Sequence, residues 1–288
     1  MINMRFAAIL ALLMVMTIVP SKLLAFSGSG HQIVCQIAYL ELSDTARTKI
    51  DHLIKIDPEY ASFAKSCTWP DSPKIRRNEH YVNLERGSVG IGDDPCPVAD
   101  RCVVTAISDD MNNLAQADDE GTQLVLLKSL GHWMGDIHQP LHVSFKDDRG
   151  GNKIKSTSPC KGNLHAVWDK CIIKRMIGKD SMQLAENLWD EVTDQDRKAW
   201  AGVKIDQTTI SSWANESFKI TVQASTGYCS TVGRECWYTS SRKQYVKGDD
   251  KKVVPTNEAY LDRQCPIIER QLEKAGVRLA QILNLMFE

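Results

Sequence analysis

Two histidine–aspartate pairs are the side chains of this chain most suited to binding a metal ion. His132 and Asp136 stand four residues apart in an apolar segment, and His165 and Asp169 repeat that spacing. Four residues advance a helix by ~400°, so the two side chains of each pair leave nearly the same face, one turn apart. Imidazole and carboxylate together suit zinc. A lone histidine on an apolar helix is more often a hydrogen-bonded core residue, but two such pairs among only seven histidines favour a metal site.

The other candidate ligands are spread along the chain, at His31, Asp71 and His80. His138 and His142 are also four residues apart, but Pro140 lies between them. Proline is expected to end the helix there, so these two histidines need not share a face.

The hydrophobic pattern predicts a chain that is almost entirely helical. Helices are expected over 30–42, 45–56, 107–117, 121–137, 164–177, 181–191, 209–224 and 258–285. We expect a long ordered loop region over 67–105, and a loop or short hairpin over 146–163. A polar, aromatic and basic loop is expected over 228–254. Alternation typical of strands is scarce, so the prediction is one compact all-α domain over 26–288.

Residues 1–25 have the layout of a secretory signal peptide. Arg5 precedes an uncharged stretch over 6–19, and Ala25 offers a small residue at which a signal peptidase could cut. The stretch is shorter than the roughly 20 residues that span a bilayer, although a retained anchor remains the alternative. No later segment is apolar enough to span. We therefore predict a secreted or periplasmic protein with no membrane attachment after cleavage.

Charge and cysteine content narrow the class of protein further. Removal of 1–25 takes away Arg5 and Lys22 and lowers the formal net charge from −1 to −3. A protein of that charge does not hold polyanions by its overall field, so positive charge at any nucleic-acid site must be local, and bound metal ions could supply it. Nine cysteines in an exported chain predict disulfides with one thiol left over. Cys96–Cys102 and Cys229–Cys236 enclose short loops and are the first expected pairs.

Several segments in a fixed order resemble one family. Residues 131–142, GHWMGDIHQPLH, resemble the signature of the zinc-dependent single-strand nucleases and 3′-nucleotidases, the S1/P1 nuclease family, which is related in fold to bacterial zinc phospholipase C. The other matching segments are 26–31 (FSGSGH), 69–71 (WPD) with Lys74 after it, 80–83 (HYVN), 150–152 (GGN), 163–169 (NLHAVWD) and 275–280 (AGVRLA). The resemblance therefore spans the chain after the signal segment.

The resemblance implies three zinc ions and their ligands. The implied ligands are Asp71, His80, His132 and Asp136 for the first ion; His142, His165 and Asp169 for the second; and, for the third, His31, Asp136 as a bridge, and the free amino and carbonyl groups of Phe26. His138 does not belong to this set. His52 lies in an expected surface helix and should face solvent.

The implied reaction is hydrolysis of the bond to O3′ in single-stranded DNA and RNA, and in 3′-nucleotides, with 5′-phosphate products from the strands. Zinc neutralises the anionic phosphodiester, and Asp71 is expected to orient a water that bridges the two ions sharing Asp136. Lys74 is either a contact to the phosphoryl oxygens or a solvated lysine. Tyr81 either stacks on a base or is a core residue. Trp237, Tyr238, Tyr245 and Lys247 form a possible second contact surface.

Three positions depart from the family pattern, and two other functions remain as alternatives. Phe26 stands where tryptophan is usual, Asn83 where aspartate is usual, and Cys171 where asparagine is usual. Asn83 predicts a weaker preference for guanine, and Cys171 is alternatively a disulfide partner of Cys160. The alternative functions are a zinc phospholipase C acting on lipid head groups and a zinc-binding protein without enzymatic activity. We expect a monomer.

Overall fold

The computed structural model describes residues 26, 28–178, 180–202, 204–249 and 251–288. The predicted signal peptide at 1–25 lies outside the described residues. The helices are α1 (Gly28–Leu40), α2 (Asp44–Lys55), α3 (Phe63–Ser66), α4 (Val103–Gln116), α5 (Glu120–His138), α6 (Leu164–Ala166), α7 (Ile172–Ile177), α8 (Ser181–Glu191), α9 (Asp194–Trp200), α10 (Gln207–Thr221) and α11 (Glu258–Phe287). Among the described residues, no helix combines the length and apolar character needed to cross a bilayer.

Short helical turns and strands connect these helices. The turns are η1 (Arg77–His80), η2 (Pro140–His142), η3 (Val167–Cys171) and η4 (Ala224–Thr226). The strands are β1 (Val82–Leu84), β2 (Val143–Phe145), β3 (Lys155–Ser156), β4 (Gly162–Asn163), β5 (Ser230–Val232), β6 (Glu235–Trp237) and β7 (Val253–Val254). β1 and β2 pair in parallel, β3 lies between β4 and β7, and β5 and β6 form a hairpin. Within the described ranges no strand exceeds three residues, and the all-α prediction is confirmed.

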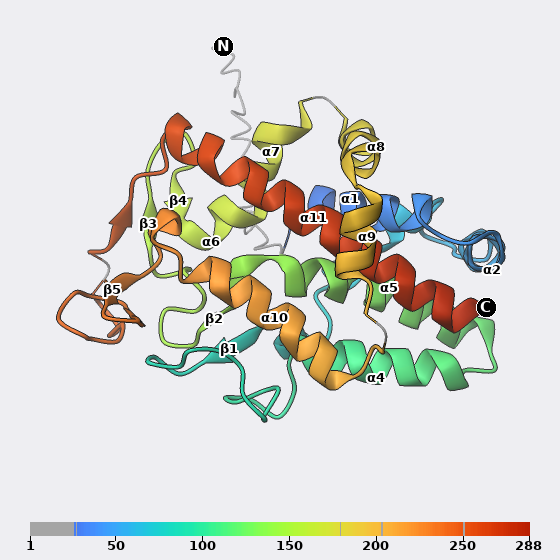
Figure 1. The fold of residues 1–288 in the computed structure, drawn as a ribbon, viewed down its shortest axis with the longest axis horizontal. Helices are drawn as coiled ribbons and strands as arrows, with labels where there is room; N and C mark the ends of the chain where they lie inside the picture. The colour runs from blue at the N-terminus through green and yellow to red at the C-terminus, as the bar shows by residue number, and fades with distance from the viewer. Residues whose placement is uncertain (1–25, 27, 179, 203, 250) are drawn as a thin grey trace, which may run out of the picture.

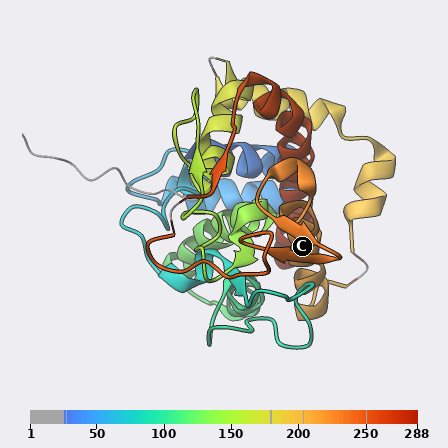
Figure 2. The ribbon, with the colours of Figure 1, turned by 90° about the vertical axis from the view of Figure 1, so that its left-hand side faces the viewer.

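Three helices form the centre of the molecule. The long helix α11 runs across it and packs on both α1 and α5, and α1 also contacts α5 (Figure 1). α5 runs toward the end of the molecule at which the strands gather, on the left in Figure 1 and facing the viewer in Figure 2. Because η2 and β2 follow α5 directly, the histidines of 131–142 are carried to that end.

Four disulfides fasten the loops to this helical frame. They are Cys35–Cys67, Cys96–Cys102, Cys160–Cys171 and Cys229–Cys236. Cys265 is the free thiol among the described residues. The two short-loop pairs and the Cys160–Cys171 pair are therefore confirmed, and Cys35–Cys67, which joins α1 to the segment after α3, was not predicted.

Most helix positions agree with the sequence, and the differences have physical causes. α5 ends at His138, two residues before Pro140, as expected because proline cannot continue the helix. α9 was not predicted, since it is only seven residues long and largely polar; Thr193 caps it.

Tyr238 was expected in an exposed contact surface, but it is only 2% exposed, and its hydroxyl donates to the carbonyl of Asp249 at 2.8 Å. That expectation was wrong.

Candidate metal centre

The parallel pairing of β1 and β2 brings His80 and His142 together. Each histidine stands just before a strand, His80 at the end of η1 and His142 at the end of η2. The register sets Val82 opposite Val143, so the two turns lie at the same edge. The Nδ1 of His142 consequently donates to the backbone carbonyl of His80 at 2.6 Å.

α5 supplies His132 and Asp136, and α1 supplies His31 beside them. The rings of His31 and His132 stack with their centroids 3.7 Å apart. This stacking depends on Gly135, because a Cβ at that position would lie 2.5 Å from Nδ1 of His31. Gly131 has the same role in the preceding turn of α5, where a Cβ would lie 2.3 Å from the sulfur of Cys67. Both glycines therefore permit the close packing around His132.

His165 and Asp169 lie where the chain leaves the regular α-helical geometry. His165 is in α6, and Asp169 is in η3, a π-helical turn that interrupts the helix expected over 164–177. π-helical turns inside helices are frequent at functional sites. Nε2 of His165 lies 3.4 Å from a carboxylate oxygen of Asp169, and Nε2 of His142 lies 3.6 Å from the other.

All eight predicted side chains meet in one cluster centred on Asp136. The Asp136 carboxylate is fully buried and lies 3.1 Å from Nδ1 of His80 and 3.2 Å from Nε2 of His132. It also lies 3.1 Å from Nδ1 of His142 and 3.7 Å from Nε2 of His31. Three groups of ligand atoms lie close enough together to hold an ion, and the first two share His132: His31, Asp71 and His132; His80, His132 and Asp136; His142, His165 and Asp169.

Backbone carbonyls fix the direction of four of the five rings. The pairs are His80 Nε2 with Ile75, His132 Nδ1 with Cys67, His142 Nδ1 with His80, and His165 Nδ1 with Gly150, at 2.6–2.9 Å. Such a bond places the proton on the outer nitrogen and leaves the lone pair of the inner nitrogen for a metal, as is usual for metal-binding histidines.

The inner atoms of the cluster do not satisfy one another. His80 Nδ1 and His132 Nε2 lie 3.1 Å apart, although both are lone-pair nitrogens if the carbonyl-bonded nitrogens carry the protons. Both nitrogens of His31, one oxygen of Asp71, both oxygens of Asp136 and Nε2 of His142 are buried with no hydrogen-bond partner among the described residues. Buried polar atoms without partners are costly, and a cation among them would offset that cost. These residues therefore fit bound metal ions.

The charge balance of the cluster agrees with this fit. Burial lowers the pKa of His31 well below its usual value, helped by the neighbouring His132, and burial also lowers the pKa of His165. Burial would lower the pKa of His142 as well, but the carboxylates of Asp136 and Asp169 outweigh it and raise this pKa to about 10. The two carboxylates thus favour a positive charge at this point, which an imidazolium or a metal ion can supply.

Phe26 lies beside His31, and the other two histidines lie outside the cluster. The Phe26 side chain is fully buried, and its ring centroid lies 6.3 Å from that of His31. His138 is turned away from the cluster toward Arg278, whose guanidinium donates to Nε2 at 2.9 Å. Burial and the Arg278 charge lower the pKa of His138 to about 3. His52 is about half exposed and lies 2.8 Å from Glu120.

A cleft of about 560 Å³ opens over the cluster. Lys74, His80, Tyr81, Asn83, His142, Arg149, His165 and Asp169 are among its lining residues. The ammonium of Lys74 lies 3.3 Å from Asp71. Tyr81 is half-buried rather than a core residue, and its hydroxyl donates to Asn78 at 3.3 Å. The predicted catalytic and substrate-binding residues therefore all lie in or beside the cleft.

The sequence did not reveal the atoms that support the cluster. The carbonyl acceptors belong to Cys67, Ile75 and Gly150, whose backbone atoms carry no signal in side-chain type. Arg149, which lines the cleft, was also missed. A signal for it existed, since it directly precedes the Gly150–Gly151 pair.

Comparisons with known proteins agree on one family. The family model described as S1/P1 Nuclease matches residues 26–288. Endonuclease 4 of Arabidopsis thaliana is 30% identical over 96% of this chain and 94% of its own length. Endonuclease 3 of the same plant is 29% identical over 96% and 93%, and Nuclease S1 of Aspergillus oryzae is 27% identical over 89% and 90%.

Proposed function

The chain belongs to the S1/P1 nuclease family, and from that premise we propose an exported nuclease that uses three zinc ions to hydrolyse single-stranded DNA and RNA to 5′-phosphate products. The named relatives are nucleases, and hydrolysis of nucleic acid is the activity that this chain shares with them. The proposal includes hydrolysis of 3′-nucleotides. The observation that carries it is the cluster of five histidines and three aspartates, in which buried atoms of His31, Asp71, Asp136 and His142 lack a hydrogen-bond partner among the described residues.

We assign the zinc ligands as the family pattern suggests. The assignment is Asp71, His80, His132 and Asp136 for one ion; His142, His165 and Asp169 for a second; and His31, Asp136 and the amino and carbonyl groups of Phe26 for the third. The Phe26 side chain supports the last set, because it is fully buried and its ring lies 6.3 Å from the ring of His31. The assignment requires cleavage of 1–25, with 26–288 as the mature domain.

The side chains of Asp71 and Lys74 have separate roles in the hydrolysis. Bound zinc supplies charge neutralisation at the phosphodiester and lowers the pKa of a water molecule. Asp71 is only 6% exposed, and its Oδ1 makes no hydrogen bond among the described residues but lies 3.3 Å from the Lys74 ammonium. A carboxylate oxygen accepts hydrogen bonds, so Asp71 can orient the attacking water. Lys74, beside Asp71 at the edge of the cleft, can place its ammonium against the phosphoryl oxygens.

Tyr81 and Asn83 are assigned to the base of the substrate. The half-buried Tyr81 ring directly follows the ligand His80 and offers a stacking surface of the kind that favours unpaired bases, at about 1–3 kcal/mol per base. The Asn83 amide both donates and accepts hydrogen bonds and carries no charge, so we expect weak discrimination in favour of guanine. Rates on the four homopolymers measure this, and a strong guanine bias would contradict the role given to Asn83.

The first experiment uses protein secreted with its own signal segment, so that Phe26 is free. Release of acid-soluble nucleotides from single-stranded DNA and RNA is followed before EDTA, after EDTA, and after zinc is restored. We expect cleavage that EDTA abolishes and zinc rescues. A protein that carries three zinc ions and cleaves neither nucleic acid would contradict the proposal, and hydrolysis of phospholipid head groups would be assayed next.

A further inference from the structure

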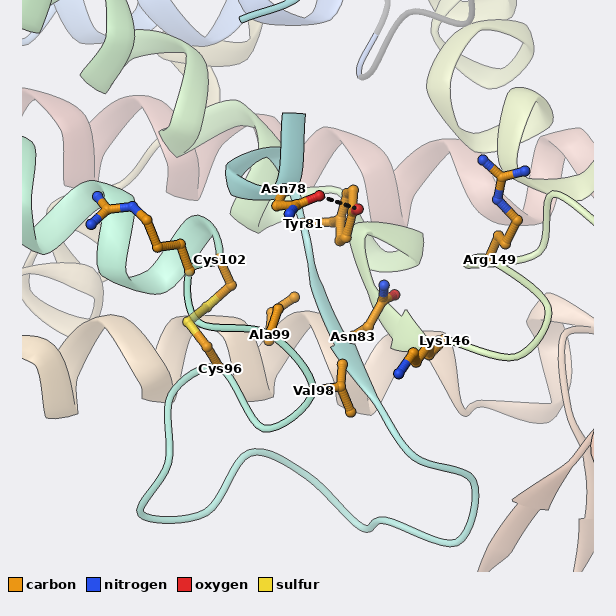
Figure 3. A pocket seen from close by; sticks show the side chains of 11 residues that line it. Asn78, Tyr81, Asn83, Cys96, Val98, Ala99, Cys102, Lys146 and Arg149 are labelled. Atoms are coloured by element: carbon orange, nitrogen blue, oxygen red, sulfur yellow. Dashed lines mark hydrogen bonds between the residues drawn. A yellow bond between two sulfur atoms is a disulfide. The ribbon is translucent and has the colours of Figure 1, made fainter. Parts of the chain in front are cut away.

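A second, smaller cavity adjoins the cleft, and neither His165 nor Asp169 lines it. Its volume is about 310 Å³, and Asn78, Tyr81, Asn83 and Arg149 line both spaces. One wall is formed by Val98, Ala99 and the Cys96–Cys102 disulfide. Lys146 and Arg149 line the side across from the disulfide; Lys146 points toward Val98, and Arg149 points away from it (Figure 3). The cavity therefore has an apolar wall, an aromatic ring and a cationic wall, which suit the base and the phosphate of a nucleotide.

The two cations of that wall are available to a ligand. Lys146 and Arg149 are both exposed. Among the described residues, the Arg149 guanidinium has no ion pair, and Lys146 has only a long contact of 3.8 Å to the exposed Glu85. Arg101, the third basic residue of this cavity, is instead occupied by Glu79 and Asp109. The proposed mature chain has a net charge of −3, so a positive wall here is a local feature rather than a consequence of the overall charge.

A tightly held turn carries these two side chains. Arg149 has a left-handed backbone with φ of 56°, which few residues other than glycine adopt. The buried Asp148 holds the turn: its carboxylate accepts from the backbone N–H of Gly151 at 3.0 Å and from the Tyr228 hydroxyl at 2.7 Å, and it pairs with Arg86. Asp148 therefore fixes the backbone of this turn, from which the side chains of Lys146 and Arg149 project.

The same turn is tied to the metal centre. Its Gly150 carbonyl accepts the proton of His165 Nδ1 at 2.8 Å. Arg149 lines both the cleft and the smaller cavity, whereas Lys146 lines only the smaller cavity. The cationic wall therefore begins beside the proposed reaction centre and extends away from it.

We propose that Lys146 and Arg149 bind the phosphate on the 5′ side of the nucleotide whose 3′ phosphate is hydrolysed. This inference rests on the proposed function. With the base in the smaller cavity and the 3′ phosphate at the metal centre, the other phosphate of that nucleotide is attached to O5′. The fixed turn carries two exposed cations on that side of the cavity, and their side chains have to turn toward an anion there, because their charged ends point in different directions (Figure 3). The chain then prefers substrates with a phosphate on both sides of the bound nucleoside over substrates with one.

The test compares two substrates that differ only in that phosphate: the thymidine dinucleotide TpT, and pTpT, which has an additional 5′ phosphate. For the zinc-loaded wild type we expect kcat/KM to be higher on pTpT. In the double variant Lys146→Gln/Arg149→Gln, we expect the ratio of pTpT to TpT to fall about fivefold, because two charge contacts to one phosphate are lost. Zinc content is measured on each protein and should remain at three.

A matched control removes the same charge elsewhere. Lys174 and Lys198 are exposed on α7 and α9, and the double variant Lys174→Gln/Lys198→Gln should keep the wild-type ratio. A Lys146/Arg149 variant that keeps this ratio, or that loses equally on both substrates, overturns the inference. Wild-type protein that hydrolyses neither dinucleotide nor polymer contradicts the proposed function instead, so the two failures are distinguishable.

Discussion

The last turns of α5 carry buried histidines with opposite surroundings. His132 faces the histidine–aspartate cluster, and His138, six residues later, faces α10 and α11. Both side chains are fully buried, so burial does not separate them. His138 is satisfied at both nitrogens: Nδ1 lies 2.8 Å from the Met134 carbonyl, and Nε2 accepts from Arg278. His132 is satisfied only at Nδ1, and its Nε2 faces a second lone-pair nitrogen and a carboxylate.

This difference indicates how a buried histidine that binds metal can be distinguished from one that only stabilises the fold. On the His138 side, Arg278 also pairs with Glu216, and Gln271 donates to the His138 carbonyl at 2.8 Å. These bonds join α5 to its neighbours and leave His138 with nothing to bind. On the His132 side, the Cys67 carbonyl also fixes the ring through Nδ1. Nε2 of His132, however, faces Nδ1 of His80, which carries no proton when His80 donates to Ile75 through Nε2. We infer that the first face stabilises the fold and the second is completed by metal.

The largest expected effect follows from removing charge at the centre of the second face. Asp136→Asn keeps the size of the side chain but removes the carboxylate that four histidines approach. We expect the two ions that share Asp136 to be lost and activity to fall by at least about a thousandfold, since zinc supplies several kcal/mol of charge stabilisation. Metal content and the rate on single-stranded DNA measure both effects.

The matched variant Asp190→Asn changes an exposed aspartate on α8 and should keep three zinc ions. If Asp136→Asn retained full zinc and activity, the distinction between the two faces of α5 would be wrong.

A smaller loss of zinc and of activity is expected when the chain is extended by one residue before Phe26. A retained Ala25 converts the free amino group into an amide, which is a much poorer ligand. We expect the zinc content to fall from three to two, and the rate to fall by about ten- to a hundredfold. A residue added after Glu288 is the control. Equal zinc content and rate in the extended and mature proteins would remove Phe26 from the ligand set.

Local spacing allowed much of the site to be predicted. The pairs His132–Asp136 and His165–Asp169 each span about one helical turn, and a periodic spacing is visible in one sequence. The adjacency of His80 and His142 was not predicted from spacing, because it depends on the register of two three-residue strands. Such short parallel strands give no hydrophobic pattern. Family resemblance, rather than periodicity, placed these two histidines in the site.

Helix ends could be predicted where proline or capping residues mark them, but burial in the polar loops could not. Tyr238 lies in a basic segment and looked exposed, yet it is buried under Lys252, whose ammonium lies 5.4 Å from the ring centroid. The Cys35–Cys67 disulfide joins residues 32 positions apart, and the packing of α1 against α3 brings them together. Contacts of that kind are set by tertiary structure.

A moderate effect is expected from loosening the backbone behind His165. Tyr228→Phe removes the hydroxyl that donates to Asp148, and Asp148 holds the turn whose Gly150 carbonyl orients His165. We expect about tenfold weaker zinc binding at the site of His142, His165 and Asp169, measured by chelator competition. Tyr39→Phe, which removes a hydrogen bond to Asp51 away from the cleft, is the control. Unchanged zinc affinity in Tyr228→Phe would show that the carbonyl is held by the rest of the turn.

The smallest expected effect on the metal centre comes from the other face of α5. His138→Leu removes the acceptor of the Arg278 guanidinium and leaves a buried charge with one partner fewer. We expect the free energy of unfolding to fall by about 1–3 kcal/mol, as measured by denaturant titration at saturating zinc, because an unsatisfied buried group costs that much. The variant should still bind three zinc ions, with the wild-type affinity in chelator competition, since neither nitrogen of His138 faces the cluster. Loss of a zinc ion in this variant would mean that the two faces are coupled through the end of α5, and hydrogen-bond satisfaction would then no longer separate a structural histidine from a ligand.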